Sequence, residues 1–125
     1  MIKEIQGLHH ITSMASNADA NNVFFTKTLG LRRVKKTVNF DAPEVYHLYY
    51  GDEIGTPGSV MTYFPFAKMS SGKRGAGEVS ITEFAVPKDA LGFWKERLSA
   101  LGVSSLIESS FLGEKRLSFD GPDGD

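Results

Sequence analysis

The sequence predicts an α+β fold built from two β-α-β-β-β units, the second of which lacks its last strand. Residues 1–66 show the pattern of a strand, a helix and three further strands. Residues 67–77 are rich in Ser, Gly and Lys and hold almost nothing apolar, which is typical of a linker or mobile loop. A strand, a helix and two strands then follow in residues 78–125. We therefore expect one domain over residues 1–125, made of two similar units.

The first strand and helix are predicted from β-branched residues and from capping residues. Residues 7–14 mix β-branched and other apolar side chains, as strands do. Ser16 and Asn17 can both cap the helix that follows, because their side-chain oxygens accept hydrogen bonds from its first N–H groups. Gly30 then ends the helix, since glycine tolerates the left-handed backbone of a C′ residue. We expect the aromatic residues of both predicted helices to pack against a sheet, not to bind a cofactor: Phe24, Phe25, Phe93 and Trp94.

The strand over residues 32–38 is predicted to lie at an exposed edge of the sheet. Its polar and apolar residues alternate poorly, because Arg32 and Lys35 fall on opposite faces of a regular strand. Residues 45–50 and 59–66 are expected to form the next two strands. The turn region between them is rich in Gly, Asp and Pro.

The second unit is expected to have a strand at residues 78–86, a helix at 89–101, and strands at 104–111 and 115–120. Apolar residues spaced by three and four positions define one face of this helix: Leu91, Trp94, Leu98 and Leu101. A Pro-Asp-Gly turn signal then comes after only two strands, whereas the first unit has three. This predicts that a final strand is missing.

Two short segments support an internal repeat. Residues 7–12 read Gly-Leu-His-His-Ile-Thr, and residues 77–82 read Gly-Glu-Val-Ser-Ile-Thr. Both segments begin with Gly and end with Ile-Thr, and each opens one unit. In this alignment, His10 corresponds to Ser80.

Composition limits the kinds of site and partner. The chain has no cysteine, which excludes disulfides and Cys-based metal sites, so a metal would need His and carboxylate ligands. A net charge of -1, from 14 basic and 15 acidic residues, gives no reason to expect a nucleic acid or an anionic membrane as partner. The N-terminus has no signal-peptide pattern, and no stretch approaches the roughly 20 apolar residues of a membrane span. We therefore expect a cytoplasmic protein.

Four stretches resemble one branch of a known superfamily: residues 7–12, 31–41, 46–53 and 55–58. Paired β-α-β-β-β units are the architecture of the vicinal-oxygen-chelate superfamily, which has the glyoxalase/bleomycin resistance/dihydroxybiphenyl dioxygenase fold. The branch resembled is that of ring-cleaving dioxygenases acting on hydroquinones and chlorinated hydroquinones. The Lys-Lys-Thr-Val-Asn-Phe-Asp and Tyr-His-Leu-Tyr-Tyr stretches carry this resemblance, whereas His-His-Ile alone is a weak signal.

The resemblance implies a mononuclear iron(II), with manganese(II) as the alternative, held by two His and one Glu. It makes His10 a metal ligand, and it places His9 and Thr12 around the site, where they are associated with substrate handling. Such a metal keeps open positions for an aromatic substrate and dioxygen. The resemblance also implies that the other ligands lie in a half absent from this sequence, so that the chain is the N-terminal part of a longer enzyme.

Strand alternation places Thr12 on the face of His10 and His9 on the opposite face, and we expect His10 on the concave side of the sheet. For His9, packing or a local hydrogen bond competes with a catalytic role. His47 shares a face with Tyr49, and it either lines the pocket or sits in a polar core.

Two other functions remain open. A metal-free small-molecule binding or resistance protein is disfavoured by the His-His pair, because a binder needs no metal ligand. A glyoxalase-type lyase needs a carboxylate facing His10, and residues 59–64 contain none. As a dioxygenase fragment, the chain alone is expected to bind iron(II) weakly or not at all, and to cleave no ring. Its unpaired sheet edge would favour a homo-oligomer.

Overall fold

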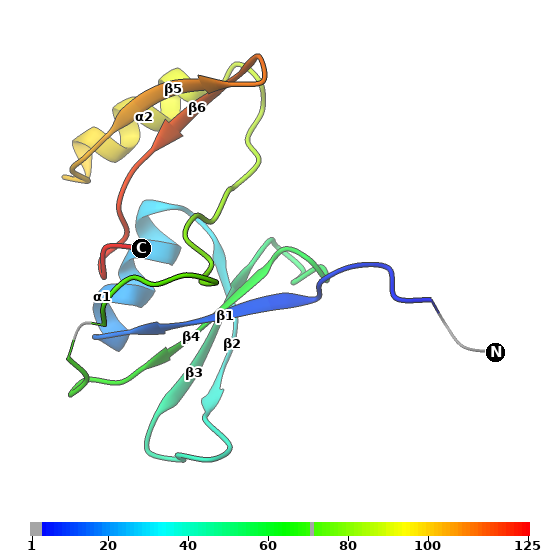
Figure 1. Cartoon of the computed structure of the whole chain (residues 1–125), viewed down its shortest axis with the longest axis vertical. Coiled ribbons are helices and arrows are strands. Elements are labelled where there is room, and N and C mark those ends of the chain that lie inside the picture. Colours follow the sequence, from blue (N-terminus) through cyan, green and yellow to red (C-terminus); the bar gives the residue numbers. More distant parts are fainter. Residues whose placement is uncertain (1–3, 71) are drawn as a thin grey trace. The chain divides into compact units, whose positions relative to one another are not determined.

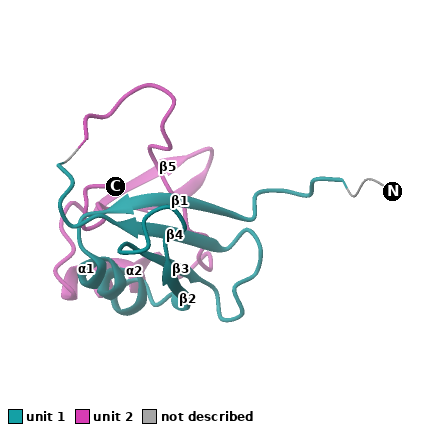
Figure 2. Cartoon of the chain, turned by 90° about the horizontal axis from the view of Figure 1, so that it is seen from below, with its two compact units in different colours: residues 1–70 teal, residues 71–125 magenta. Residues whose placement is uncertain are grey.

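The computed structural model describes residues 4–70 and 72–125, which divide into two units, Met1–Ser70 and Ser71–Asp125 (Figure 2). The first unit follows the predicted order of a strand, a helix and three strands. A short π-helical stretch, η1, continues the helix α1. The elements of this unit are β1 (His10–Ala15), α1 (Ala18–Val23), η1 (Phe24–Thr28), β2 (Arg32–Val38), β3 (Tyr46–Gly51) and β4 (Val60–Pro65). The linker boundaries expected from the sequence stay a prediction.

The four strands of the first unit form one sheet in the order β1-β4-β3-β2 (Figure 1). The β1 and β4 strands run parallel, whereas β4 with β3 and β3 with β2 run antiparallel. The predicted edge position of β2 and the mainly antiparallel pairing are confirmed. The pairing of β1 with β4 therefore joins the first and last strands of the unit, which are far apart in sequence.

The predicted helix caps are also confirmed. The Asn17 side chain accepts a hydrogen bond from the Ala20 backbone N–H at 2.9 Å, which satisfies one of the free donors of α1. Gly30 has a φ of +74°, a left-handed conformation that glycine adopts without the strain of a Cβ. The helical segment therefore begins and ends where local side-chain chemistry favours it.

A bulge in β2 places two of its basic residues differently from the arrangement predicted from the sequence. The pairing of β2 with β3 shifts between Arg33 and Lys35, so that Arg32 lies opposite Gly51 and Lys35 lies opposite Tyr49. Residues two apart on β3 share a face, and Arg32 and Lys35 therefore share a face as well. The expectation that they fall on opposite faces is wrong, because it assumed a regular strand.

The core of the first unit lies between η1 and one face of the sheet. Phe25 is 3% exposed, and its ring centroid lies 4.9 Å from those of both Tyr50 and Tyr63. Full burial of one such side chain contributes about 1.5–3 kcal/mol. The other buried residues of this cluster are Ala15, Leu48 and Met61.

The second unit contains α2 (Leu91–Ala100) and a two-stranded antiparallel sheet of β5 (Ile107–Phe111) and β6 (Glu114–Ser118). Leu98 is 1% exposed, and Leu91 and Trp94 are partly buried, as the helical spacing predicts. The expectations for Phe93 and Leu101 are wrong, because these side chains are 59% and 52% exposed. A helix followed by an antiparallel pair of strands is therefore the part of the repeat that both units share.

The strand predicted at residues 78–86 is not formed in the second unit. Its counterpart in the first unit, β1, pairs only with β4, and the described part of the second unit holds no strand in the position of β4. A strand needs a hydrogen-bonding partner, so residues 78–86 keep their strand-like sequence without forming one. Ser80 therefore has no strand position to compare with that of His10. An ion pair of 2.6 Å between Glu83 and Arg116 links this segment to β6.

Candidate active site

Polar side chains from three strands gather on the sheet face opposite the core. On β1, exposed and inward-facing residues alternate: His10 and Thr12 are exposed, while Ile11 is half-buried and Ala15 is buried against the core. The prediction that His10 and Thr12 share a face is thus confirmed, and His10 does not lie beneath a helix. That this face is concave stays a prediction.

His9 lies beside His10 and not on the far side of the sheet. Its Nδ1 is 3.0 Å from the Nδ1 of His10, and the two rings meet edge to face at 88°. The expectation from strand alternation is wrong here, because His9 precedes the first residue of β1. The His9 carbonyl instead accepts a hydrogen bond from the Gly58 N–H at 2.7 Å. One of the two facing Nδ1 atoms must therefore carry a proton and the other must accept it.

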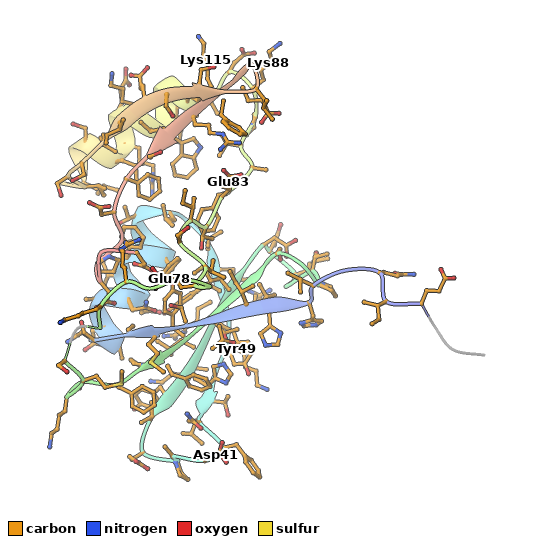
Figure 3. All side chains as sticks on the ribbon, in the orientation of Figure 1. Asp41, Tyr49, Glu78, Glu83, Lys88 and Lys115 are labelled. Carbon is orange, nitrogen blue, oxygen red and sulfur yellow. The ribbon has the colours of Figure 1, made fainter. Side chains whose placement is uncertain are left out.

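A continuous row of hydrogen bonds crosses the same face from β3 to β1. The Tyr49 hydroxyl lies 2.9 Å from His47 Nδ1, and His47 Nε2 lies 3.0 Å from Thr62 Oγ1. The Thr62 hydroxyl donates to Thr12 Oγ1 at 2.8 Å. Figure 3 shows Tyr49 among the side chains of the sheet. The row thus ends at Thr12, two residues along β1 from His10.

The surroundings of His47 favour its neutral form. Burial lowers the pKa of the His47 imidazole below its usual 6.5, and the nearby positive charges of His10 and Lys35 lower this pKa further. The imidazole lies between two aromatic rings, with centroid distances of 4.2 Å to Tyr49 and 4.0 Å to Phe64. Both ring nitrogens are engaged in hydrogen bonds. The geometry is that of a hydrogen-bonding residue, not of a metal ligand.

A basic side chain borders the same face. The Lys35 ammonium lies 5.4 Å from the ring centroid of Tyr49, within the range of a cation–π contact. Arg32, which the bulge brings to this face, donates a hydrogen bond from its guanidinium to the Glu53 carbonyl. The open face thus combines imidazoles, hydroxyls and positive charge.

Comparison with known proteins identifies relatives over nearly the whole chain. No family model matches. The chain is 42% identical over 123 residues to the chlorohydroquinone/hydroquinone 1,2-dioxygenase of Sphingobium indicum, covering 97% of this chain and 38% of that protein. It is 50% identical over 115 residues to MhqE of Bacillus subtilis (strain 168), provisionally named a ring-cleaving dioxygenase, covering 92% of this chain and 38% of MhqE. The chain therefore spans well under half the length of these curated relatives.

Solved structures share the fold. The crystal structure of a provisionally assigned dioxygenase from Bacillus subtilis subsp. subtilis str. 168 has a TM-score of 0.90 and 43% sequence identity, covering 97% of this chain and 39% of that one. A mutant of FosX, the fosfomycin resistance protein of Listeria monocytogenes, has a TM-score of 0.70 at 18% identity, covering 97% and 88% of the two chains. The chain has the fold of the vicinal-oxygen-chelate superfamily, and its curated relatives are named ring-cleaving dioxygenases. The likeness to FosX shows the fold alone.

The predicted fold class is confirmed by these structures. The names of the relatives agree with the hydroquinone-type dioxygenase branch on which the sequence resemblance rested. No helix in the described part of the chain has the length and apolar character to cross a membrane.

The vicinal-oxygen-chelate fold implies a metal ion, and His10 is a suitable ligand for it on the open face of the sheet. His10 is an exposed imidazole, and a metal could use the ring nitrogen that does not face His9. Among residues 4–70 and 72–125, however, no three His, Asp or Glu side chains lie close enough together to hold a metal ion. His10 fits the role of one ligand, but the donor set within these residues is incomplete.

The opposite face of β3 is structural. The Tyr50 hydroxyl is buried and has no hydrogen-bond partner, and burial raises the pKa of its phenol to about 12. Tyr49 and Tyr50 are neighbours in sequence, yet only Tyr49 lies on the face of His47. This pair offers a matched control for any test of the site.

Two residues of the site could not be assigned from the sequence. The sequence does not decide whether His47 lines the pocket or sits in a polar core, and the structure shows it joined to Thr62 and Tyr49 by hydrogen bonds. Thr62 was missed, because only the strand register places it between Thr12 on β1 and Tyr49 on β3. The alternation of residues along β4 predicts which face of the sheet Thr62 lies on, but it does not predict which residues of β1 and β3 lie next to Thr62.

Proposed function

We propose that the chain contributes the His10 face to a metal-dependent dioxygenase that opens the ring of hydroquinone-type aromatics. The observation that carries this proposal is the 42% identity to a chlorohydroquinone/hydroquinone 1,2-dioxygenase over 97% of the chain, with His10 exposed on a polar sheet face. The substrates are then a small electron-rich aromatic compound and dioxygen.

The proposed metal is iron(II), with manganese(II) as the alternative, and His10 is its ligand from this chain. The metal, when bound, brings the aromatic ring and dioxygen together. The remaining ligands are proposed to come from outside residues 1–125, in keeping with the absence of a three-residue cluster among the described residues.

His9 is proposed to position His10. An imidazole that binds a metal through one nitrogen usually donates a hydrogen bond from the other, which fixes its tautomer and ring orientation. His9 Nδ1 lies 3.0 Å from His10 Nδ1 and can accept that bond. Thr12, on the same face as His10, is proposed to contact an oxygen of the substrate.

The test uses anaerobic iron(II) titration and oxygen uptake with hydroquinone, on the 125-residue chain and on the complete gene product that contains it. We expect the chain alone to bind iron(II) weakly and to consume no oxygen, because a single imidazole supplies a small part of the affinity of a full site. In the active gene product, His10→Ala should remove metal binding and oxygen uptake together.

Three outcomes would contradict this proposal in different ways. Tight stoichiometric binding and turnover by the 125-residue chain would show that the ligand set is complete within it. Full activity of the His10→Ala gene product would remove His10 from the metal site. Tight hydroquinone binding without metal or oxygen uptake would favour the metal-free binding protein instead.

A further inference from the structure

The row of hydrogen bonds across the open face joins residues that are distant in sequence. Tyr49 pairs with Thr62 across β3 and β4, and Thr62 pairs with Thr12 across β4 and β1. Thr62 is 0% exposed, whereas Thr12 is exposed and Tyr49 is half-buried. The row therefore has a sealed centre and two accessible ends.

Every member of the row can donate one hydrogen bond and accept another, provided that His47 is neutral. In the direction that the structure gives, Thr62 donates to Thr12, so His47 Nε2–H donates to Thr62 and the Tyr49 hydroxyl donates to His47 Nδ1. The reverse direction uses the same contacts, with Thr12 donating to Thr62 and His47 Nδ1–H donating to Tyr49. The row thus has two arrangements that differ only in where the protons sit.

Both ends of the row flank His10. Thr12 lies two positions along β1 on the same face, and the Tyr49 ring centroid lies 6.4 Å from that of His10. Burial, the largest cause of the lowered pKa of His47, favours a single proton on its imidazole, and both ring nitrogens lie within hydrogen-bond distance of a hydroxyl group. A doubly protonated ring could not accept a proton from Thr62.

We propose that Thr12, Thr62, His47 and Tyr49 form a proton relay between solvent and a hydroxyl group of an aromatic substrate held beside His10. This inference rests on the proposed function for the nature of the substrate. The substrate O–H gives its proton to Thr12 Oγ1, and the Thr12 proton passes to Thr62. The Thr62 proton passes to His47 Nε2, His47 Nδ1 gives its proton to Tyr49, and the Tyr49 hydroxyl releases its own proton to solvent.

This transfer is balanced and involves no oxidation. One O–H bond is lost from the substrate, one proton reaches solvent, and each relay member ends with the number of protons with which it began. The relay then has the direction that the structure gives, with the Thr12 hydroxyl hydrogen left to donate to the substrate oxygen anion. The reverse transfer would return a proton to a product oxygen and reset the relay.

The test compares conservative variants that break the relay with a neighbour that does not. Tyr49→Phe removes one end, Thr62→Val removes the centre, and Thr62→Ser restores its hydroxyl. Tyr50→Phe, on the buried face, is the matched control, because its hydroxyl has no partner. In the complete gene product loaded with iron(II), we expect kcat for hydroquinone to fall about 100-fold in Tyr49→Phe and Thr62→Val, as for loss of a general acid–base group.

Three further results would separate a relay from simple support of the sheet. KM for hydroquinone should change little, the solvent deuterium isotope effect on kcat should change in both relay-breaking variants, and Thr62→Ser should recover most of kcat. Thr62→Val and Tyr49→Phe with wild-type kcat and isotope effect would overturn the relay. Equal losses in Thr62→Ser and Thr62→Val would also overturn it, because they would indicate a packing role.

A measurement that does not depend on turnover tests the relay separately from the proposed dioxygenase activity. The ring nitrogen signals of His47, followed by ¹⁵N NMR in the gene product, report which nitrogen carries the proton. Adding hydroquinone should shift the balance between Nδ1–H and Nε2–H in wild type and in Tyr50→Phe, but not in Thr62→Val. A shift without oxygen uptake would contradict the dioxygenase and retain the relay. Oxygen uptake without a shift would retain the dioxygenase and overturn the relay.

Discussion

The two units share a helix followed by an antiparallel pair of strands, but they differ in what these elements bury. In the first unit, α1, η1 and a four-stranded sheet enclose Phe25, Tyr50 and Tyr63. In the described part of the second unit, Leu98 is the buried apolar residue, and Ile81 and Phe111 are 74% and 55% exposed. The difference follows from β4, which holds β1 in place in the first unit. An equivalent sequence pattern therefore gives an equivalent structure only where its pairing partner is present.

The largest expected effect is at a buried phenylalanine of η1, and it is compared with that at an exposed phenylalanine of α2. Phe25→Ala should destabilise the first unit by about 3–5 kcal/mol, because it leaves a cavity among closely packed rings. Phe93→Ala should change stability by less than about 0.5 kcal/mol, since its side chain is mostly exposed. Denaturant unfolding followed by residue-resolved hydrogen exchange measures both. Similar losses in the two variants would show that Phe93 is buried in solution.

A smaller effect is expected at the turn between β5 and β6. Leu112 and Gly113 connect strands whose end residues, Phe111 and Glu114, are paired, and both have positive φ values of +50° and +83°. This two-residue turn favours Asn-Gly, whereas Leu is strained there. Leu112→Asn should stabilise the second unit by about 1 kcal/mol, measured by the protection of β5 and β6 amides from exchange. Leu112→Ala is the control, because it removes the exposed side chain but keeps the strain.

The smallest expected effect is on the pH dependence of stability. This dependence should differ between the units, because all three histidines lie in the first one. The pKa of His47 is lowered by burial and by the charges of His10 and Lys35, so the unfolded chain binds its proton more readily. The contribution of His47 to stability is therefore present above pH 6.5 and is lost as the pH falls from 6.5 towards the lowered pKa. Thermal unfolding between pH 7.5 and 5 should show this decline in wild type and a weaker one in His47→Gln. A steeper decline in His47→Gln would reverse the assigned sign.

Features fixed by local chemistry could be predicted from the sequence. The bounds of β2, the Asn17 cap and the turn of Gly30 depend on residues close to one another, and the structure confirms them. The shared face of His10 and Thr12 follows from strand alternation alone. These parts of the site needed no knowledge of pairing.

Features that depend on distant partners could not be predicted. The bulge between Arg33 and Lys35 appears only in the pairing of β2 with β3, and the role of Thr62 only in its register with β1 and β3. Residues 78–86 have a strand-like sequence but no partner strand among the described residues. Strand alternation does not apply to His9, because β1 begins at His10. In each case non-local hydrogen bonding decided the outcome.

The parallel pairing of β1 with β4 has a consequence for the order in which the site forms. His10 lies opposite Val60 and Thr12 lies opposite Thr62, so the strand that emerges first from the ribosome must wait for one made some 50 positions later. The antiparallel pair of β2 and β3 has shorter connections and can form before that. During synthesis, we therefore expect the strand with His10 and Thr12 to join the sheet no earlier than β4, and to remain unpaired until then.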